Sequence, residues 1–349
     1  MKYYIGLDAH KSTCTAVVVR ENGDQVLRET FPTTEGNLVG FLHKIDGEKH
    51  LTFEEGNLAQ WLQLLLRPEV DRLLVCNPVY VAKKQGAKTD FRDALHLAQE
   101  LRTNHLKPVY HDNSKWMELR TLVNSYSDLV DGIVGTKLRL KALFRSFGLD
   151  TDDGKFYENR EQIKDLPNEV AKFVAESFFT QMEALEKQKA EYTEYFRKNR
   201  QRHKPVKNLC SIPGISDVRA NIIVAIVCSP QRFKTKHQFW GYSMLVRHIQ
   251  MSGGKIYGNR RVHGRKELRD VFIGAAENAL RGESSLRGYY EAQRAKGLAH
   301  REAKLALARK IAGLSLALLK NNDTFKNDFE HQQMEKVAIR KTLNLEATI

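Results

Sequence analysis

The sequence has few cysteines and no long apolar run, and these two absences exclude several classes of protein. Its four cysteines form no Cys-x-x-Cys pair, so the sequence predicts neither a disulfide framework nor a zinc site. No segment has the length and apolar character of a membrane span. The chain runs straight from Met1 into a predicted strand, without the pattern of a signal peptide. We therefore expect a reduced, cytoplasmic compartment.

Acidic residues are in the minority. The 349 residues include 56 Lys and Arg against 42 Asp and Glu, which gives a net charge of +14. Such an excess favours a polyanionic partner, and nucleic acid is the first candidate. The hydrophobic fraction of 42% is sufficient for real cores, and the length allows two or three domains.

The first hundred residues alternate between strand and helix patterns. Three strands joined by tight turns come first and predict an antiparallel meander, with Asn22-Gly23 as one turn signal. The order continues as helix, strand, helix, strand, helix, which predicts a mixed sheet with helices packed against it. The predicted strands are 3–7, 14–19, 25–31, 51–54 and 72–76, and the predicted helices are 35–45, 58–66 and one beginning near Asp90.

Four carboxylates stand at the ends of these elements. Asp8 ends the first strand, Glu54 ends the fourth, and Asp90 and Asp93 share one face of the last helix at a spacing of three. Clustered carboxylates raise one another's pKa, and a divalent cation relieves that repulsion. Magnesium takes oxygen ligands, and carboxylate-bound metals serve phosphodiester chemistry. The pattern thus suggests a Mg²⁺ site formed by Asp8, Glu54, Asp90 and Asp93.

Each acid also has a simpler interpretation. Acids in a first helical turn are favoured by capping and by the helix dipole, and taken alone the Asp90/Asp93 pair is more often that than a metal site. Glu54 competes with Glu55, and we choose Glu54 because strand alternation points it to the opposite face from the apolar Phe53. Basic residues surround the acids: Lys11, Lys83, Lys84, Lys88 and Arg92.

This order of acids on a βββαβαβα frame resembles the ribonuclease-H/RuvC-like nuclease fold. More closely, it resembles the N-terminal domain of the DEDD transposases of the insertion-sequence "one-ten" family, which are related to Piv-type DNA invertases. An actin-like ATPase or sugar-kinase fold shares the Ile5-to-Asp8 pattern and the core topology, but a later glycine-rich phosphate loop is not found. The residues that carry the resemblance are GLDAHK at 6–11, FEEG at 53–56, NP at 77–78 and KTDFRDA at 88–94.

The rest of the chain is predicted to be mainly helical. Apolar residues alternate at spacings of three and four from Leu119 to Phe147, which predicts a coiled-coil seam. A second long helix is predicted over 168–200, with an apolar face of Val170, Phe173, Val174, Phe178 and Met182. Ser211 to Ser216 contains a Pro-Gly turn before an apolar helix at 218–227, which has helix-hairpin-helix character and could bind a backbone phosphate or be a plain turn. Further helices are expected at 268–280 and after 284.

Residues 205–285 resemble the serine-bearing C-terminal domain of the same family. Ser252-Gly253 matches the family's nucleophilic serine, and basic residues follow it: Lys255, Arg260, Arg261, Arg265 and Arg269. A lone Ser-Gly is usually only a loop, so this assignment depends on the N-terminal match. The chain departs from the family pattern at 242–247 and 264–269, which leaves the subgroup and local loop geometry open. The expected domains are 1–110 (RuvC-like), 111–204 (coiled-coil spacer), 205–285 (serine-bearing) and 286–349 (C-terminal helices and tail).

The resemblance implies a transposase, a site-specific DNA recombinase of a bacterial or archaeal, nucleoid-associated kind. It implies that the carboxylates bind Mg²⁺ and that Ser252 forms a covalent 5′-phosphoserine link before strands are exchanged. It also implies donor and target DNA, a guide (bridge) RNA, and homodimers that assemble into a homotetramer, in which carboxylates and serine come from different protomers. Two alternatives stay open: a RuvC-like endonuclease that cuts by hydrolysis, and a non-catalytic nucleic-acid-binding protein with structural acids.

Overall fold

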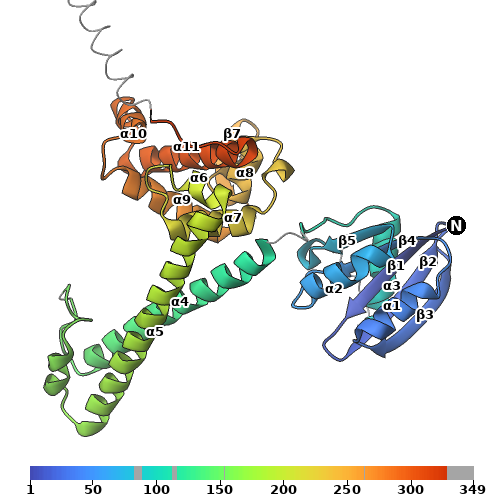
Figure 1. Cartoon of the computed structure of the whole chain (residues 1–349), viewed down its shortest axis with the longest axis horizontal. Helices are drawn as coiled ribbons and strands as arrows, with labels where there is room; N and C mark the ends of the chain where they lie inside the picture. The colour runs from blue at the N-terminus through green and yellow to red at the C-terminus, as the bar shows by residue number, and fades with distance from the viewer. Residues whose placement is uncertain (82–88, 112–115, 153, 263, 328–349) are drawn as a thin grey trace, which may run out of the picture. The chain divides into compact units, whose positions relative to one another are not determined.

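The computed structural model describes residues 1–81, 89–111, 116–152, 154–262 and 264–327. The chain divides into two compact units, Met1–Asn113 and Ser114–Ile349, shown in Figure 1 in blue to cyan and in green to red. The first is a mixed α/β domain and the second is mostly helical. Within the described ranges, the helices are all too short or too polar to cross a membrane.

The first unit is built on a five-stranded sheet in the order β3-β2-β1-β4-β5. The first three strands pair antiparallel, whereas β4 runs parallel to both β1 and β5. This confirms the predicted meander followed by α/β crossovers. The elements are β1 (Lys2–Ala9), β2 (Thr13–Arg20), β3 (Gln25–Pro32), α1 (Glu35–His43), β4 (Glu48–Glu54), α2 (Ala59–Leu66), η1 (Arg67–Glu69), β5 (Arg72–Cys76), η2 (Pro78–Tyr80) and α3 (Asp90–Arg102).

Alternate residues of β1 face the two sides of the sheet. Ile5 and Leu7 belong to the core that includes the buried leucines of α1 and α2. On the opposite face, buried Val17 and Val19 of β2 pack with Ala94 and Ala98 of α3. Because side chains alternate along a strand, the even-numbered residues of β1 are those that face α3.

Gly6 sets the distance between β1 and α3. A Cβ atom at this position would lie 2.0 Å from the carbonyl oxygen of Ala94 and 2.6 Å from the amide nitrogen of Ala98. Only glycine therefore permits this approach of helix backbone to strand. Asp8 is the next residue on the same side of β1, so the contact at Gly6 places the first turn of α3 beside Asp8.

In the second unit, α4 (Trp116–Ser146) and α5 (Glu169–Arg202) form an antiparallel pair. Phe144 near the end of α4 packs with Phe179 of α5, while Leu119 at the start of α4 belongs to the same core as Phe196 near the end of α5. Leu119, Leu129, Ile133, Thr136 and Leu140 of the predicted seam are buried, whereas Phe147 at its end is exposed. A coiled coil stays a prediction.

The predicted apolar face of the second long helix is partly wrong. Val170 and Phe173 are each 74% exposed, and the buried face consists of Ala171, Ala175, Phe179 and Met182. Two small alanines allow the buried Phe156 and Leu166 of the preceding segment, which contains η3 (Arg160–Asp165), to pack directly on the helix. Side-chain size thus decided the packed face more than hydrophobicity did.

The remaining elements form one core with the ends of α4 and α5. The helices predicted at 218–227, at 268–280 and beyond 284 are confirmed, while the two-stranded β6-β7 sheet was not predicted. The elements are α6 (Lys204–Leu209), α7 (Asp217–Val227), η4 (Pro230–Arg232), α8 (Lys236–Tyr242), β6 (Arg247–Ser252), β7 (Lys255–Arg261), α9 (Lys266–Ala279), α10 (Ser285–Ala295) and α11 (His300–Asn321).

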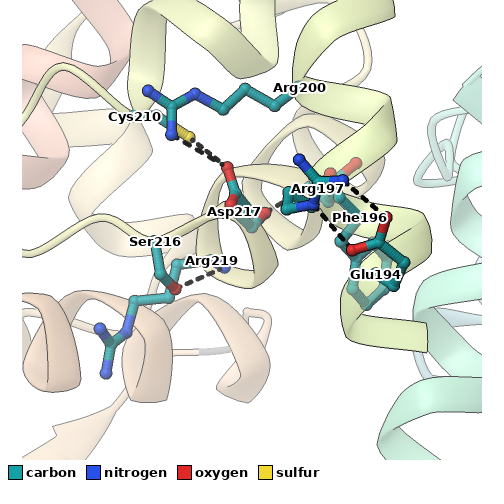
Figure 2. Close-up of polar contacts among 9 residues, drawn as sticks. Glu194, Phe196, Arg197, Arg200, Cys210, Ser216, Asp217 and Arg219 are labelled. Carbon is teal, nitrogen blue, oxygen red and sulfur yellow. Dashed lines mark hydrogen bonds and ion pairs between the residues drawn. The ribbon is translucent and has the colours of Figure 1, made fainter. Parts of the chain in front are cut away.

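The predicted Pro-Gly turn lies between α6 and α7. Gly214 has a φ of +92°, and a Cβ atom there would lie 2.1 Å from the carbonyl oxygen of Ala275 in α9. Ser216 caps α7 by accepting from the amide of Arg219 (Figure 2). Asp217 accepts from the Cys210 thiol and pairs with Arg200. Burial and the Asp217 charge raise the pKa of Cys210 to about 12. The turn is thus held by packing and ion pairing, and phosphate binding there stays a prediction.

Candidate metal centre and serine hairpin

The end of β1 and the start of α3 bring three ligand-type side chains together. Ligand atoms of Asp8, His10 and Asp90 lie within 4.8 Å of one another, one from each residue. His10 Nε2 is 3.4 Å from Asp8 Oδ2 and 3.7 Å from Asp90 Oδ1. Asp8 and Asp90 are 82 positions apart in the sequence, so the fold itself creates this cluster.

Asp90 is not the cap of α3. The preceding residue, Thr89, is the N-cap, and its hydroxyl accepts a hydrogen bond from the amide of Arg92. The capping interpretation of Asp90 is therefore wrong, because Thr89 already satisfies that amide. The carboxylate of Asp90 is 57% exposed, while the helix dipole still favours its charge in the first turn.

Asp8 lies in an environment that resists its negative charge. Partial burial raises the pKa of Asp8, and the charges of Asp90 and Asp93 raise it further, whereas His10 lowers it. Asp93 therefore lies close enough to act electrostatically on Asp8, although it is outside the three-residue cluster. Like charges concentrated in this way are held most readily with a bound cation.

Glu54 ends β4, the strand parallel to β1. Leu7 pairs with Phe53, so Asp8 and Glu54 directly follow paired residues on neighbouring strands. Residues in register point to the same face of a sheet, which puts Glu54 on the α3 side with Asp8. The register of Glu54 with Cys76 agrees with this, since Cys76 packs with Leu97 and Leu101 of α3. Burial raises the pKa of Cys76 to about 12, and the charge of Glu54 adds to the effect.

Glu55, the competing acid, has a different partner. Its carboxylate pairs with Nε2 of His111, and Nδ1 of the same ring lies 3.1 Å from Oε1 of Gln60. The His111 side chain is 6% exposed. Glu55 is thus engaged with His111, and Glu54 as the metal ligand stays a prediction.

His10 is the residue of this site that the sequence analysis did not assign. It lies in the turn between β1 and β2, where its amide donates to Thr13 and its carbonyl accepts from the hydroxyl of Thr33. The signal that could have found it is its spacing, two residues after Asp8. Lys11 and Arg92 are exposed near the cluster, whereas Lys83, Lys84 and Lys88 lie outside the described residues.

Ser252 lies at the end of a β-hairpin. It closes β6 and pairs with Lys255 of β7 across Gly253 and Gly254. Both glycines have positive φ, +55° and +76°, as a type I′ turn requires. Ser252 and Lys255 are exposed. The turn therefore holds the Ser252 hydroxyl at the surface of its unit.

The predicted basic residues lie on β7 of the hairpin and at the start of α9. Arg260 is exposed on β7, and Arg261 is the backbone partner of Arg247. Nη2 of Arg265 lies 3.2 Å from Oε1 of Glu267, and Nη1 of Arg269 lies 3.8 Å from Oδ1 of Asp270. Arg265 and Arg269 thus have acidic neighbours on α9, which makes them weaker candidates for phosphate contact than Lys255 and Arg260.

Comparison with known proteins matches both units. Residues 5–148 match a DEDD family described as "Transposase", and residues 206–291 match one described as "Transposase IS116/IS110/IS902 family". The chain is 27% identical over 120 residues to the "Insertion element IS110 uncharacterized 43.6 kDa protein" of Streptomyces coelicolor, which covers 34% of this chain and 30% of that protein. It is 23% identical over 388 residues to the "Insertion element IS900 uncharacterized 42 kDa protein" of Mycobacterium paratuberculosis, covering 92% and 96%.

Proposed function

We propose that the chain is a transposase of the IS110 family and the DNA recombinase of an insertion sequence. In this proposal the carboxylates of the first unit hold a divalent metal and Ser252 of the second becomes covalently joined to DNA. The convergence of Asp8 and Asp90 at the end of β1 is the observation that carries it. The sheet order, with β1 central and parallel to β4, supports a RuvC-like fold for the first unit.

The residues at the end of β1 fit a hard divalent cation. Asp8 and Asp90 offer oxygen ligands within 4.8 Å of each other. Glu54 follows β4 on the same side of the sheet as Asp8, and Asp93 lies in the same helical turn as Asp90. Magnesium prefers such oxygen ligands. His10 lies beside both carboxylates and, when protonated, would offset their charge. A bound Mg²⁺ would polarise the phosphate and stabilise the charge on the displaced oxygen.

Ser252 would attack the phosphorus of one DNA strand through Oγ. The new Ser–O–P bond forms as the bond from phosphorus to the 3′-oxygen breaks. The hydroxyl proton of Ser252 leaves in this step, and the 3′-oxygen takes up one proton to become a 3′-hydroxyl. The serine keeps the 5′-phosphate, so the energy of the phosphodiester is conserved. Attack by another strand's 3′-hydroxyl then reverses the step and releases Ser252. A serine hydroxyl needs activation for such an attack.

The same proposal extends to partners. Donor and target DNA are the substrates, a guide RNA selects them, and two homodimers form the active homotetramer. The net charge of +14 supports nucleic-acid partners in general. The long α4-α5 pair has exposed apolar residues, among them Leu138 and Phe173 at 62% and 74%, which supports pairing with another copy through a coiled coil.

The experiment is a covalent-adduct assay with the full chain, its co-purified RNA and DNA carrying the element's ends. Wild-type protein in Mg²⁺ should give a protein–DNA species that survives denaturing gel electrophoresis. Ser252→Ala and omission of metal should abolish it, and Ser146→Ala, an exposed serine on α4, should not. DNA nicking that persists in Ser252→Ala would instead support a hydrolytic endonuclease. Recombination that tolerates Asp8→Asn and Asp90→Asn would show that the acids are structural.

A further inference from the structure

The β6-β7 hairpin has two chemically different faces. Residues paired across a hairpin share a face, and faces alternate along each strand. Ser252 pairs with Lys255, Gln250 with Gly258, and His248 with Arg260, so these residues form one face. Oε1 of Gln250 lies 3.2 Å from where a Gly258 Cβ would stand, which agrees with this assignment. This Ser252 face is polar and carries the cations Lys255 and Arg260.

Near the turn, the opposite face of the hairpin is apolar. Ile249, Met251 and Ile256 alternate with the residues of the Ser252 face and are 59%, 56% and 63% exposed. The register shift after Gln250 leaves Tyr257 without a cross-strand partner in the hairpin. Arg247 belongs to this second face, at the end of the hairpin far from the turn. Near the turn, a phosphate backbone therefore finds charge complementarity on the Ser252 face, where Lys255 lies.

The sequence around the hairpin has no anionic residue. Between Asp217 and Glu267 the chain contains neither aspartate nor glutamate, although both types are frequent elsewhere. Among the ion pairs of the described ranges, none includes Lys255. Arg265 and Lys266 at the end of this stretch pair with Glu267 and Asp270 of α9, whereas Lys255 at the hairpin turn is available to phosphate.

Lys255 is the cation nearest to Ser252 along the hairpin. The two residues flank a two-residue turn, where facing Cβ atoms are about 5 Å apart. A lysine side chain is long and flexible enough to reach any group bound at the serine hydroxyl. No other Lys or Arg shares a cross-strand pair with Ser252.

We propose that Lys255 is a second catalytic residue, whose ammonium group binds the non-bridging oxygens of the phosphate that Ser252 attacks. It holds the phosphorus over Oγ of Ser252 and stabilises the negative charge that grows on those oxygens in the transition state. No proton is transferred to or from Lys255 in this role. The inference rests on the proposed function, because it takes Ser252 as the nucleophile.

The test compares Lys255→Gln with Arg247→Gln, which removes one positive charge from the other face of the same hairpin. Single-turnover adduct formation should slow about 100-fold in Lys255→Gln and less than about 3-fold in Arg247→Gln. Lys255→Arg, which keeps the charge, should recover most of the rate. DNA affinity, measured by fluorescence anisotropy, should change by less than about 5-fold in each, since one phosphate contact contributes little to the total.

A neutral substrate supplies the second measurement. With a methylphosphonate at the scissile position, one non-bridging oxygen and its charge are gone, so Lys255→Gln should slow the reaction by less than about 3-fold. Equal rates for Lys255→Gln and Arg247→Gln on normal DNA would overturn the role of Lys255 alone. A Ser252→Ala protein that still forms the adduct, or a wild-type protein that forms none, would overturn the proposed function as well.

Discussion

The carboxylate cluster and the serine hairpin are built in opposite ways. Asp8 stands at the end of a central strand, beside a helix brought close by Gly6, and its neighbours come from positions up to 82 residues away. Ser252 stands on an isolated two-stranded ribbon whose partners are within a few residues. The first site depends on the whole domain, whereas the second depends on one turn. Substitutions should therefore affect stability at the first site and presentation of the serine at the second.

The largest effect is expected from substitution of Glu54, for which the neighbouring Glu55 is the matched control. Glu54→Gln should lower adduct formation by at least about 100-fold, because it removes a proposed metal ligand on the face of Asp8. Glu55→Gln should change the rate less than about 3-fold, since Glu55 pairs with His111. Single-turnover rates at saturating Mg²⁺ measure both. The opposite ranking would move the metal ligand to Glu55.

Gly6 tests how far the first site depends on packing. Gly6→Ala should lower the free energy of unfolding of the first unit by about 3 kcal/mol, because the new Cβ would overlap the backbone of α3. Gly40→Ala is the matched control, since nothing lies within 4 Å of its added Cβ, and alanine in α1 should stabilise by about 0.5–1 kcal/mol. Thermal unfolding decides between them. A Gly6→Ala protein as stable as wild type would refute the close approach.

Gly254 tests the second site in the same way and should have the smallest effect. Gly254→Ala places a side chain at a φ of +76°, a cost of about 1–2 kcal/mol borne by the turn. Adduct formation should fall about 10-fold while the melting temperature stays constant. Gly253→Asn should be neutral, because Asn-Gly suits a type I′ turn. A loss of global stability in Gly254→Ala would show that the hairpin is integral to the core.

The sequence was sufficient for the α/β domain because its signals are local and strong. Alternating strand and helix patterns, the Asn-Gly turn and acids at strand ends predict the βββαβαβα order and the placement of Asp8 and Glu54. His10 was not assigned to the site because a single histidine in a turn forms no recognisable sequence pattern. The role of Gly6 was not predicted because glycine is required there by contact with the backbone of α3, which lies 88 residues or more along the chain.

The C-terminal unit was harder to predict. Gly253-Gly254 is a hairpin signal, but the flanking strands mix basic, polar and apolar residues on two exposed faces, so no buried stripe marks them. In α5 the alanines Ala171 and Ala175 define the packed face, while the more hydrophobic Val170 and Phe173 are exposed. A periodicity search weighted by hydrophobicity does not find a helix face on which small residues allow neighbouring segments to pack closely.

Identification of the residue that becomes joined to DNA tests the central claim most directly. The wild-type adduct, formed in Mg²⁺ and digested with nuclease and protease, can be sequenced by tandem mass spectrometry. We predict a nucleoside 5′-phosphate joined to Oγ of Ser252, within a peptide that also contains the Gly253-Gly254 turn. A nucleotide on another residue, such as the exposed Tyr257 of the same hairpin, would contradict it, as would cleaved DNA with no protein attached.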